Sequence, residues 1–143
     1  MPKSGPIIIV EDDLDDQEII TDLLRELRIP NELLFFPNSN EAYQYLIRPD
    51  KQQPFIIFSD INLPGENGLD FKNRIDSNPN LRQQSIPFVF LSTFAGKNAV
   101  DRAYTQMSVQ GFFEKPSDIG DFKNLLYLII DYWKRCRHPN SDF

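Results

Sequence analysis

The sequence predicts an α/β domain in which a parallel β-sheet is covered by helices on both faces. Short apolar runs rich in β-branched and aromatic residues alternate along the chain with segments whose apolar residues recur at helical spacing. The runs are almost continuously apolar, which is typical of strands buried on both faces. Because strand–helix–strand units join parallel strands by right-handed crossovers, this alternation favours a doubly wound sheet with five strands and five helices.

Five apolar runs mark the predicted strands, and turn-forming residues bound them. The third run is the clearest, because it leads into Asp60 and the dipeptide Pro64-Gly65 then favours a turn. Pro37 follows the second run and Pro87 precedes the fourth. The predicted strands are Ile7–Val10, Leu33–Phe36, Phe55–Phe58, Phe88–Leu91 and Gly111–Phe113.

Each predicted strand is followed by a predicted helix with one apolar face. The first helix stops before Pro30, since the residue before a proline disfavours the helical conformation. The third helix runs from Gly68 to about Ser77, with Pro79 ending it. The five apolar faces span residues 20–27, 42–47, 71–75, 100–107 and 122–133.

Length and composition restrict the class of protein. A chain of 143 residues fits one domain over 1–143, with a core of about 6–136 and a frayed tail at 137–143. The net charge of −6 argues against a nucleic-acid partner, and no apolar run approaches the ~20 residues that span a membrane. Cys136 is the only cysteine, which excludes an internal disulfide and makes a reducing, cytoplasmic location the simpler expectation.

Polar residues follow four of the five predicted strands. Ligands of open parallel sheets bind beyond the carboxyl ends of the strands, where those ends meet. The residues at these ends are Glu11, Asp12 and Asp13 after the first strand, Asp60 after the third, Ser92 and Thr93 after the fourth, and Glu114 and Lys115 after the fifth. The sequence therefore predicts one rim that carries acids, a hydroxyl group and a lysine.

Three of these acids, Glu11, Asp12 and Asp60, indicate a cation site. Two carboxylates ~4 Å apart repel each other by about 4 kcal/mol at an effective dielectric constant near 20. A site that keeps three of them together must protonate one or bind a cation, and hard oxygen ligands suit Mg²⁺. Asp15 and Asp16 have a simpler interpretation, because acids stabilise the N-terminus of a helix.

Lys115 is the only cation predicted at this rim. It follows Phe113 and Glu114 and precedes Pro116, which restricts the segment that carries it. Pro116 also makes the Lys115–Pro116 bond a candidate cis peptide, because X–Pro bonds lose most of the trans preference. The rim therefore combines one ammonium group with several carboxylates.

Together, these strand-end motifs resemble the receiver domain of two-component response regulators. The resemblance extends over residues 7–133, and each motif stands at a strand end in the family's order. It implies the flavodoxin-like strand order 2-1-3-4-5. The motifs are Ile-Ile-Val-Glu11-Asp12-Asp13, Asp60-Ile61-Asn62-Leu63-Pro64-Gly65 with Gly68, Phe90-Leu91-Ser92-Thr93, and Phe112-Phe113-Glu114-Lys115-Pro116.

The resemblance implies that Asp60 is the phosphoacceptor. It would attack the phosphorus of a phosphohistidine on a sensor histidine kinase or a histidine phosphotransfer protein. The resemblance also implies that Mg²⁺ is held by Glu11, Asp12, Asp60 and the backbone carbonyl of Asn62. Asp13 aligns just outside this metal site.

The resemblance further assigns the groups around the phosphate. Ser92 matches the hydroxyl that bonds one phosphoryl oxygen, and Lys115 matches the lysine that pairs with another. Phe112 stands where many receivers carry a tyrosine that reports phosphorylation, and Thr93 and Phe94 belong to the same switch region. We expect the apolar ring of Phe94 to slow loss of the phosphate.

The expected function is a stand-alone signalling switch rather than an enzyme in the usual sense. It would catalyse its own phosphorylation and dephosphorylation and act on an unknown downstream protein, as a monomer or weak dimer. A phosphorelay intermediate is equally compatible. The alternative from another class is a Mg²⁺-dependent phosphohydrolase with an Asp nucleophile, although Asn62 stands where such enzymes usually carry a proton-transferring Asp. A flavodoxin-like cofactor site is excluded, because the acidic loop after the first strand repels phosphate.

Overall fold

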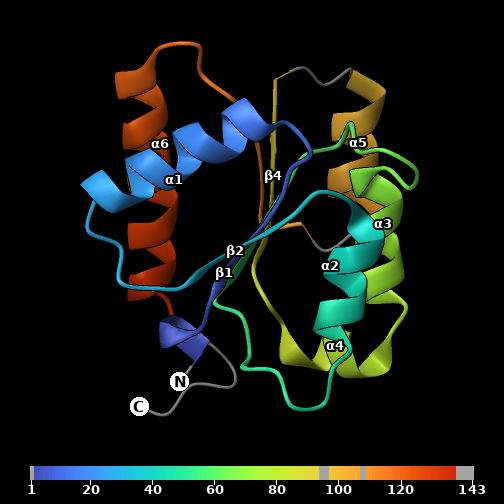
Figure 1. Cartoon of the computed structure of the whole chain (residues 1–143). Coiled ribbons are helices and arrows are strands. Elements are labelled where there is room, and N and C mark those ends of the chain that lie inside the picture. Colours follow the sequence, from blue (N-terminus) through green and yellow to red (C-terminus); the bar gives the residue numbers. More distant parts are fainter. Residues whose placement is uncertain (1, 94–96, 107–108, 138–143) are drawn as a thin grey trace.

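The computed structural model describes residues 2–93, 97–106 and 109–137. Within these residues, five parallel strands form one sheet in the order β2-β1-β3-β4-β5 (Figure 1). The predicted fold class and strand order are therefore confirmed. The strands are β1 (Ile7–Val10), β2 (Leu33–Phe36), β3 (Ile56–Ser59), β4 (Phe88–Ser92) and β5 (Gly111–Glu114).

Six α-helices and a short 3₁₀ helix, η1 (Pro2–Ser4), occur in the described part of the chain. The prediction of five α-helices was one too few, because α4 begins at Pro79, the residue expected only to end α3. Proline is tolerated at the first helical position, where its missing N–H has no partner in the helix. Asn78 caps α4 by accepting hydrogen bonds from Asn80 N and Leu81 N. The helices are α1 (Leu14–Glu26), α2 (Ser39–Leu46), α3 (Gly68–Asp76), α4 (Pro79–Gln84), α5 (Lys97–Gln106) and α6 (Ile119–Arg135).

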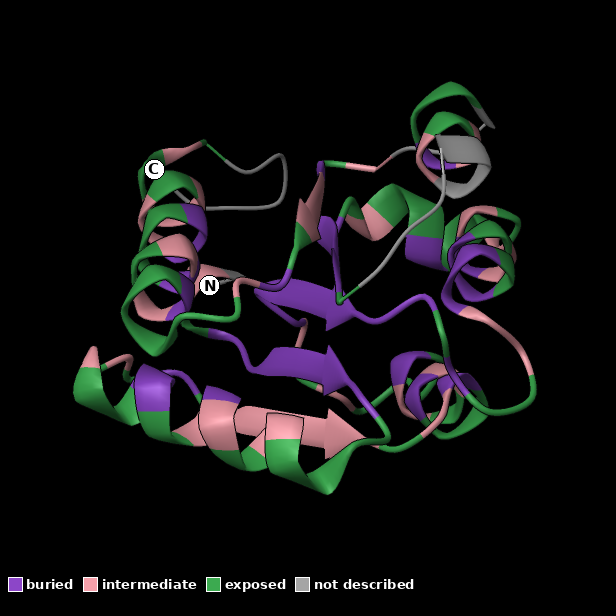
Figure 2. Cartoon of the chain, turned by 90° about the horizontal axis from the view of Figure 1, so that it is seen from above, coloured by how far each residue is buried: buried purple, intermediate pink, exposed green. Residues whose placement is uncertain are grey.

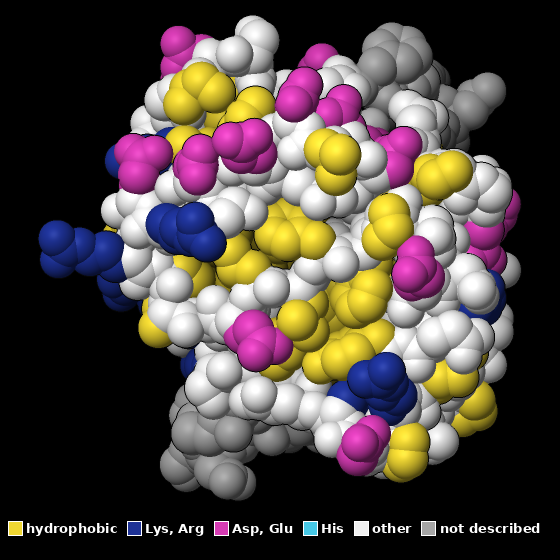
Figure 3. All heavy atoms as spheres, viewed as in Figure 1, with side chains coloured by type: hydrophobic (Ala, Val, Ile, Leu, Met, Phe, Trp, Pro, Cys, Tyr) yellow, Lys and Arg dark blue, Asp and Glu magenta, His cyan; other side chains and the backbone are white. Residues whose placement is uncertain are grey.

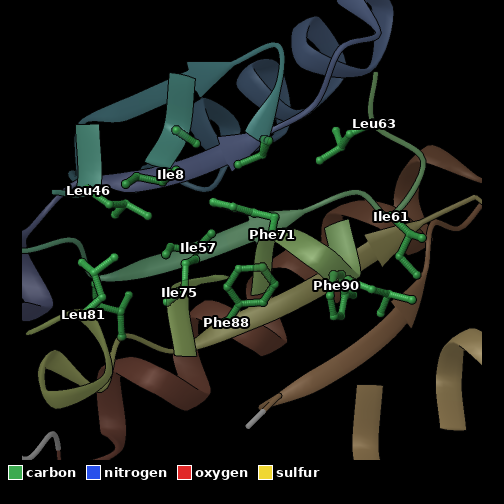
Figure 4. Close-up of a cluster of buried hydrophobic side chains, with 14 of the residues drawn as sticks. Ile8, Leu46, Ile57, Ile61, Leu63, Phe71, Ile75, Leu81, Phe88 and Phe90 are labelled. Atoms are coloured by element: carbon green, nitrogen blue, oxygen red, sulfur yellow. The ribbon is translucent and has the colours of Figure 1, made fainter. Parts of the chain in front are cut away.

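The helices form two layers, with α1 and α6 on one face of the sheet and α2 to α5 on the other (Figure 1). Alternate residues of each strand point to opposite faces, so Ile7 and Ile9 pack toward α1 and α6 while Ile8 and Val10 pack toward α2 and α3. Phe88 and Phe90 pack on the same face as Ile8 and Val10, in one hydrophobic cluster with Phe71 of α3 (Figure 4).

The central strands are buried, and the β2 edge is less well covered. Figure 2 shows β1 and β3 as buried throughout and β2 as intermediate. On this edge, hydrophobic side chains are visible between the two helix layers (Figure 3). Acidic side chains gather above them, over α1, whose residues Asp15, Glu18 and Asp22 are exposed (Figure 3). No helix within the described ranges is long and apolar enough to cross a membrane.

The strand register brings the carboxyl ends of the strands to one rim. Val10 pairs with Ser59, so the residues that follow them, Glu11 and Asp60, lie at the ends of neighbouring strands. Asp60 N donates a hydrogen bond to Val10 O at 3.1 Å, which extends this pairing by one residue. On the other side of β4, Lys115 N donates to Ser92 O at 2.8 Å. The pairing of the strands alone therefore brings four polar residues to one rim, namely Glu11, Asp60, Ser92 and Lys115.

Candidate functional site

Asp60 lies at the centre of the rim and is held by donors from the loop after β3 and from the end of β4. It is only 8% exposed. Its Oδ1 accepts hydrogen bonds from Ile61 N at 2.7 Å, Asn62 N at 3.2 Å and Ser92 Oγ at 3.0 Å. Ser92 is the last residue of β4 and is itself buried. These bonds fix the orientation of the carboxylate, and Oδ2 faces Lys115.

Lys115 brings a buried ammonium group to the same carboxylate. Its Nζ lies 3.5 Å from Asp60 Oδ2 and 2.9 Å from Asp16 Oδ2, and it donates a further hydrogen bond to Glu11 Oε1. The lysine is 8% exposed, as buried as Asp60. The Lys115–Pro116 peptide bond is trans, so the expectation of a candidate cis bond was wrong.

Burial and ion pairing act in opposite directions on Glu11 and Lys115. Burial raises the pKa of Glu11 to about 6, although the hydrogen bond and charge of Lys115 favour the ionised carboxylate. Burial by itself lowers the pKa of Lys115, but its hydrogen bonds to Glu11 and Asp16 outweigh this, and the pKa lies above the usual value of 10.5. The ammonium is therefore retained across the physiological pH range.

The acidic loop after β1 is ordered by its own hydrogen bonds. Asp13 is the N-cap of α1 and accepts hydrogen bonds from Asp15 N at 2.9 Å and Asp16 N at 3.2 Å. Gln17 Nε2 donates to Glu11 O at 2.6 Å, which fastens the first turn of the helix to the end of β1. Asp13 therefore has a structural role as a helix cap, and its position outside the metal site stays a prediction.

Asp16 is the site residue that the sequence interpretation missed. The sequence predicts for it, as for Asp15, only a general stabilising effect on the helix N-terminus, whereas in the structure it forms an ion pair with Lys115. The spacing contains the signal that separates the two acids. Asp16 precedes the buried residues Ile20 and Leu23 by four and seven positions, so it shares their helical face, and Asp15 does not.

The predicted metal ligands are only partly brought together. Glu11 and Asp60 contact the same ammonium group, while Asp12 and Asn62 are exposed at the rim. No group of three or more His, Cys, Asp or Glu side chains within the described residues is arranged to hold a metal ion. The donor chemistry nevertheless fits a hard cation, because Glu11 and Asp60 already share one positive charge.

Two glycines shape the loop between β3 and α3. Gly65 has a φ of +75°, a conformation that side-chain-bearing residues rarely adopt. Gly68 lies against the backbone of Asp60, and a Cβ on it would be 2.2 Å from Asp60 O. Gly68 N also donates to Ile61 O at 2.8 Å. The first residue of α3 therefore packs directly on the segment that carries Asp60.

Of the three predicted switch residues, Phe112 pairs with Phe90 of the neighbouring strand, Thr93 follows Ser92, and Phe94 lies outside the described ranges. Phe112 is half-buried on β5, and its ring centroid is 5.4 Å from that of Phe90 on β4. Thr93 is exposed directly after Ser92. Phe94 lies outside the described residues. The switch roles of these three residues stay predictions.

Comparisons with known proteins agree with the fold and with the family resemblance. Residues 7–127 match the family model of the response regulator receiver domain. The chain is 26% identical over 131 residues to the response regulator Rcp1 of Synechocystis sp., covering 89% of this chain and 87% of that protein.

Two solved structures resemble the chain over nearly its whole length. The phosphorylated cyanobacterial phytochrome response regulator RcpA has a TM-score of 0.84 and 25% identity, with 96% of this chain and 99% of that chain covered. The Mn²⁺-bound form of Rcp1 has a TM-score of 0.82 and 25% identity, with 95% and 99% covered. The family match, which spans most of the sequence, decides the identity: this chain belongs to the response regulator receiver domains of two-component signalling.

Proposed function

We propose that the chain is a phosphorylatable signalling switch in which Asp60 accepts a phosphoryl group from a phosphohistidine donor. One observation carries this proposal. The Asp60 carboxylate lies between a hydroxyl donor, Ser92 Oγ at 3.0 Å, and a buried ammonium, Lys115 Nζ at 3.5 Å. Phosphoryl transfer requires little covalent chemistry from a protein, so placement and neutralisation of oxygen charge supply most of the catalysis.

The transfer can be written with these residues, the phosphohistidine donor and a proton from water. A carboxylate oxygen of Asp60 attacks the phosphorus, and an O–P bond forms as the P–N bond to the donor histidine breaks. The electron pair of the broken bond stays on the imidazole nitrogen, which takes a proton from water. Lys115 offsets the negative charge on one phosphoryl oxygen, and the Ser92 hydroxyl donates to another. The N–H groups of Ile61 and Asn62 hold the carboxylate in place meanwhile.

A divalent cation, for which we propose Mg²⁺, belongs to this function. Lys115 forms ion pairs with three carboxylates, those of Glu11, Asp16 and Asp60. When all three are ionised, two negative charges remain uncompensated. Glu11, Asp12, Asp60 and the backbone carbonyl of Asn62 would hold the ion. When bound, it would neutralise charge on the phosphoryl oxygens. The Mn²⁺-bound structure of the relative Rcp1 supports a divalent ion in this fold.

The signal would pass from Ser92 toward the surface formed by α5, β5 and α6. A Ser92 hydroxyl drawn to a phosphoryl oxygen would alter the space beside Phe112, whose ring already contacts the ring of Phe90. The outer face of α6 exposes Leu128 and Tyr132, which a downstream protein could cover. The donor would be a sensor histidine kinase or a histidine phosphotransfer protein, and onward relay of the phosphate remains the second form of the same function.

The deciding experiment is exposure to acetyl phosphate with Mg²⁺, followed by intact-mass measurement. The parent chain should gain one phosphate, and Asp60→Asn should gain none. A parent that gains no phosphate, or an Asp60→Asn variant that gains as much as the parent, contradicts the proposal. Repeated release of phosphate from small phosphate esters would instead indicate the phosphohydrolase, which is disfavoured because the Asn62 amide transfers no proton.

A further inference from the structure

We infer that Asp16 is a positioning residue that holds the Lys115 ammonium within reach of the phosphoryl group on Asp60. This inference rests on the proposed function and adds a residue to it. Its starting point is the 2.9 Å contact between Lys115 Nζ and Asp16 Oδ2, which joins the first turn of α1 to the end of β5.

The three acceptors of Lys115 account for its three N–H donors. Within the described residues these acceptors are Glu11 at the end of β1, Asp16 in α1 and Asp60 at the end of β3. The lysine side chain is 4% exposed, and that of Asp16 is 26% exposed. The ammonium is therefore oriented mainly by carboxylates.

Two of these three carboxylates have another duty in the proposed reaction. Glu11 is a proposed ligand of the divalent ion, and Asp60 carries the incoming phosphoryl group. Both would change what they offer to Lys115 as the reaction proceeds. Asp16 is the one acceptor whose interaction with the lysine need not change. Its contribution to holding the Lys115 ammonium should therefore be greatest when metal and phosphoryl donor are bound.

The backbone of Asp16 is fixed well enough for this task. Its N–H donates to the Asp13 cap at 3.2 Å, and the neighbouring residue Gln17 is tied to Glu11 O. The helical face that carries Asp16 continues into Ile20 and Leu23, which are buried against the sheet. The carboxylate therefore projects from a rigid turn toward the rim rather than from a free loop.

Asp15 provides a matched control on the same turn. It carries the same charge and also donates its N–H to Asp13, but it is exposed and lies off the buried helical face. Asp15→Asn and Asp16→Asn remove equal charge from almost the same place. Only the second substitution removes a charged partner of Lys115.

The test measures the rate of phosphorylation by acetyl phosphate at saturating Mg²⁺ for the parent, Asp15→Asn, Asp16→Asn and Asp16→Glu. Asp16→Asn should be slower by about tenfold, the order expected for loss of one charge-assisted hydrogen bond. Asp15→Asn should stay close to the parent, and Asp16→Glu, which restores a carboxylate, should recover part of the rate. Thermal unfolding of each variant checks that the fold is retained.

A second readout separates positioning from a general loss of stability. The ¹H–¹⁵N signal of the Lys115 ammonium, identified by its absence in Lys115→Arg, should persist in Asp15→Asn and broaden in Asp16→Asn. Mn²⁺ affinity should fall equally in both Asn variants. Equal phosphorylation rates in the two Asn variants, an unchanged Lys115 signal, or a specific loss of Mn²⁺ binding in Asp16→Asn would each overturn the inference. A parent that takes no phosphate at all would instead overturn the proposed function.

Discussion

Gly68→Ala is the sharpest steric test of how α3 positions Asp60. The added Cβ would lie 2.2 Å from Asp60 O and 2.9 Å from Ile61 Cα, both below the 3.0 Å that real Cβ atoms respect. The atoms in the way are backbone, so the β3–α3 segment must shift by somewhat less than about 1 Å. Overpacking of this kind costs roughly 1–3 kcal/mol, and alanine recovers at most about 1 kcal/mol through helix propensity. We expect a net loss of roughly 1–2 kcal/mol in the free energy of unfolding.

The functional effect should exceed the effect on stability, because a misplacement of about 1 Å can cost on the order of 100-fold in rate. Urea unfolding and phosphorylation by acetyl phosphate measure the two quantities on the same samples. Gly120→Ala is the control, since Gly120 lies in the first turn of α6 and its added Cβ would meet only the Asp118 side chain, at 3.1 Å. If Gly68→Ala unfolds and reacts like Gly120→Ala, Asp60 is not positioned by this contact.

Three further predictions concern titration, the hydroxyl and the switch region. Because the pKa of Glu11 is raised from 4.5 to about 6, its contribution to stability is present below pH 4.5 and lost as the pH rises through 6. In urea unfolding without metal, the free energy of unfolding should therefore fall by up to about 2 kcal/mol as the pH rises from 4.5 through 6. Glu11→Gln should abolish this fall, and a fall of the same size in that variant would contradict its origin in Glu11. Ser92→Ala should lower the phosphorylation rate about tenfold with Ser92→Thr close to the parent, and equal rates for both variants would exclude a role for the hydroxyl. Phe94→Glu should shorten the half-life of the phosphorylated chain, and an unchanged half-life would show that this ring does not restrict water.

The strands were predictable from the sequence because they are almost continuously apolar. Runs such as Ile7–Val10 are apolar at every position, and their short length, their β-branched residues and the turn residues around them indicate strands buried on both faces. The polar ends follow from the same rule, since parallel strands expose their carboxyl ends together. Residues far apart in the chain, Ser92 and Lys115, could therefore be placed beside Asp60 without coordinates.

The parts that were missed depend on information that residue type does not carry. A proline ends one helix and begins another with equal ease, so Pro79 concealed α4. The trans geometry at Pro116 depends on tertiary context, because X–Pro bonds differ little in intrinsic energy between the two isomers. Helical spacing distinguishes Asp16 from Asp15, because only Asp16 lies on the buried face of α1. An acid in the first turn of a helix is, however, already explained by its effect on the helix N-terminus, and the ion pair with Lys115 was therefore not expected.

The exposed position of Asp12 has a physical reason in the charge of the rim. One ammonium group, that of Lys115, already serves the carboxylates of Glu11, Asp16 and Asp60. A fourth carboxylate brought inward would meet a net negative charge, and at ~4 Å each uncompensated pair costs about 4 kcal/mol at an effective dielectric constant near 20. Water is therefore the better environment for Asp12 until a divalent cation adds charge. On this argument Asp12→Asn should weaken Mn²⁺ binding without lowering metal-free stability. A variant that is less stable without metal would show that Asp12 is part of the folded charge network.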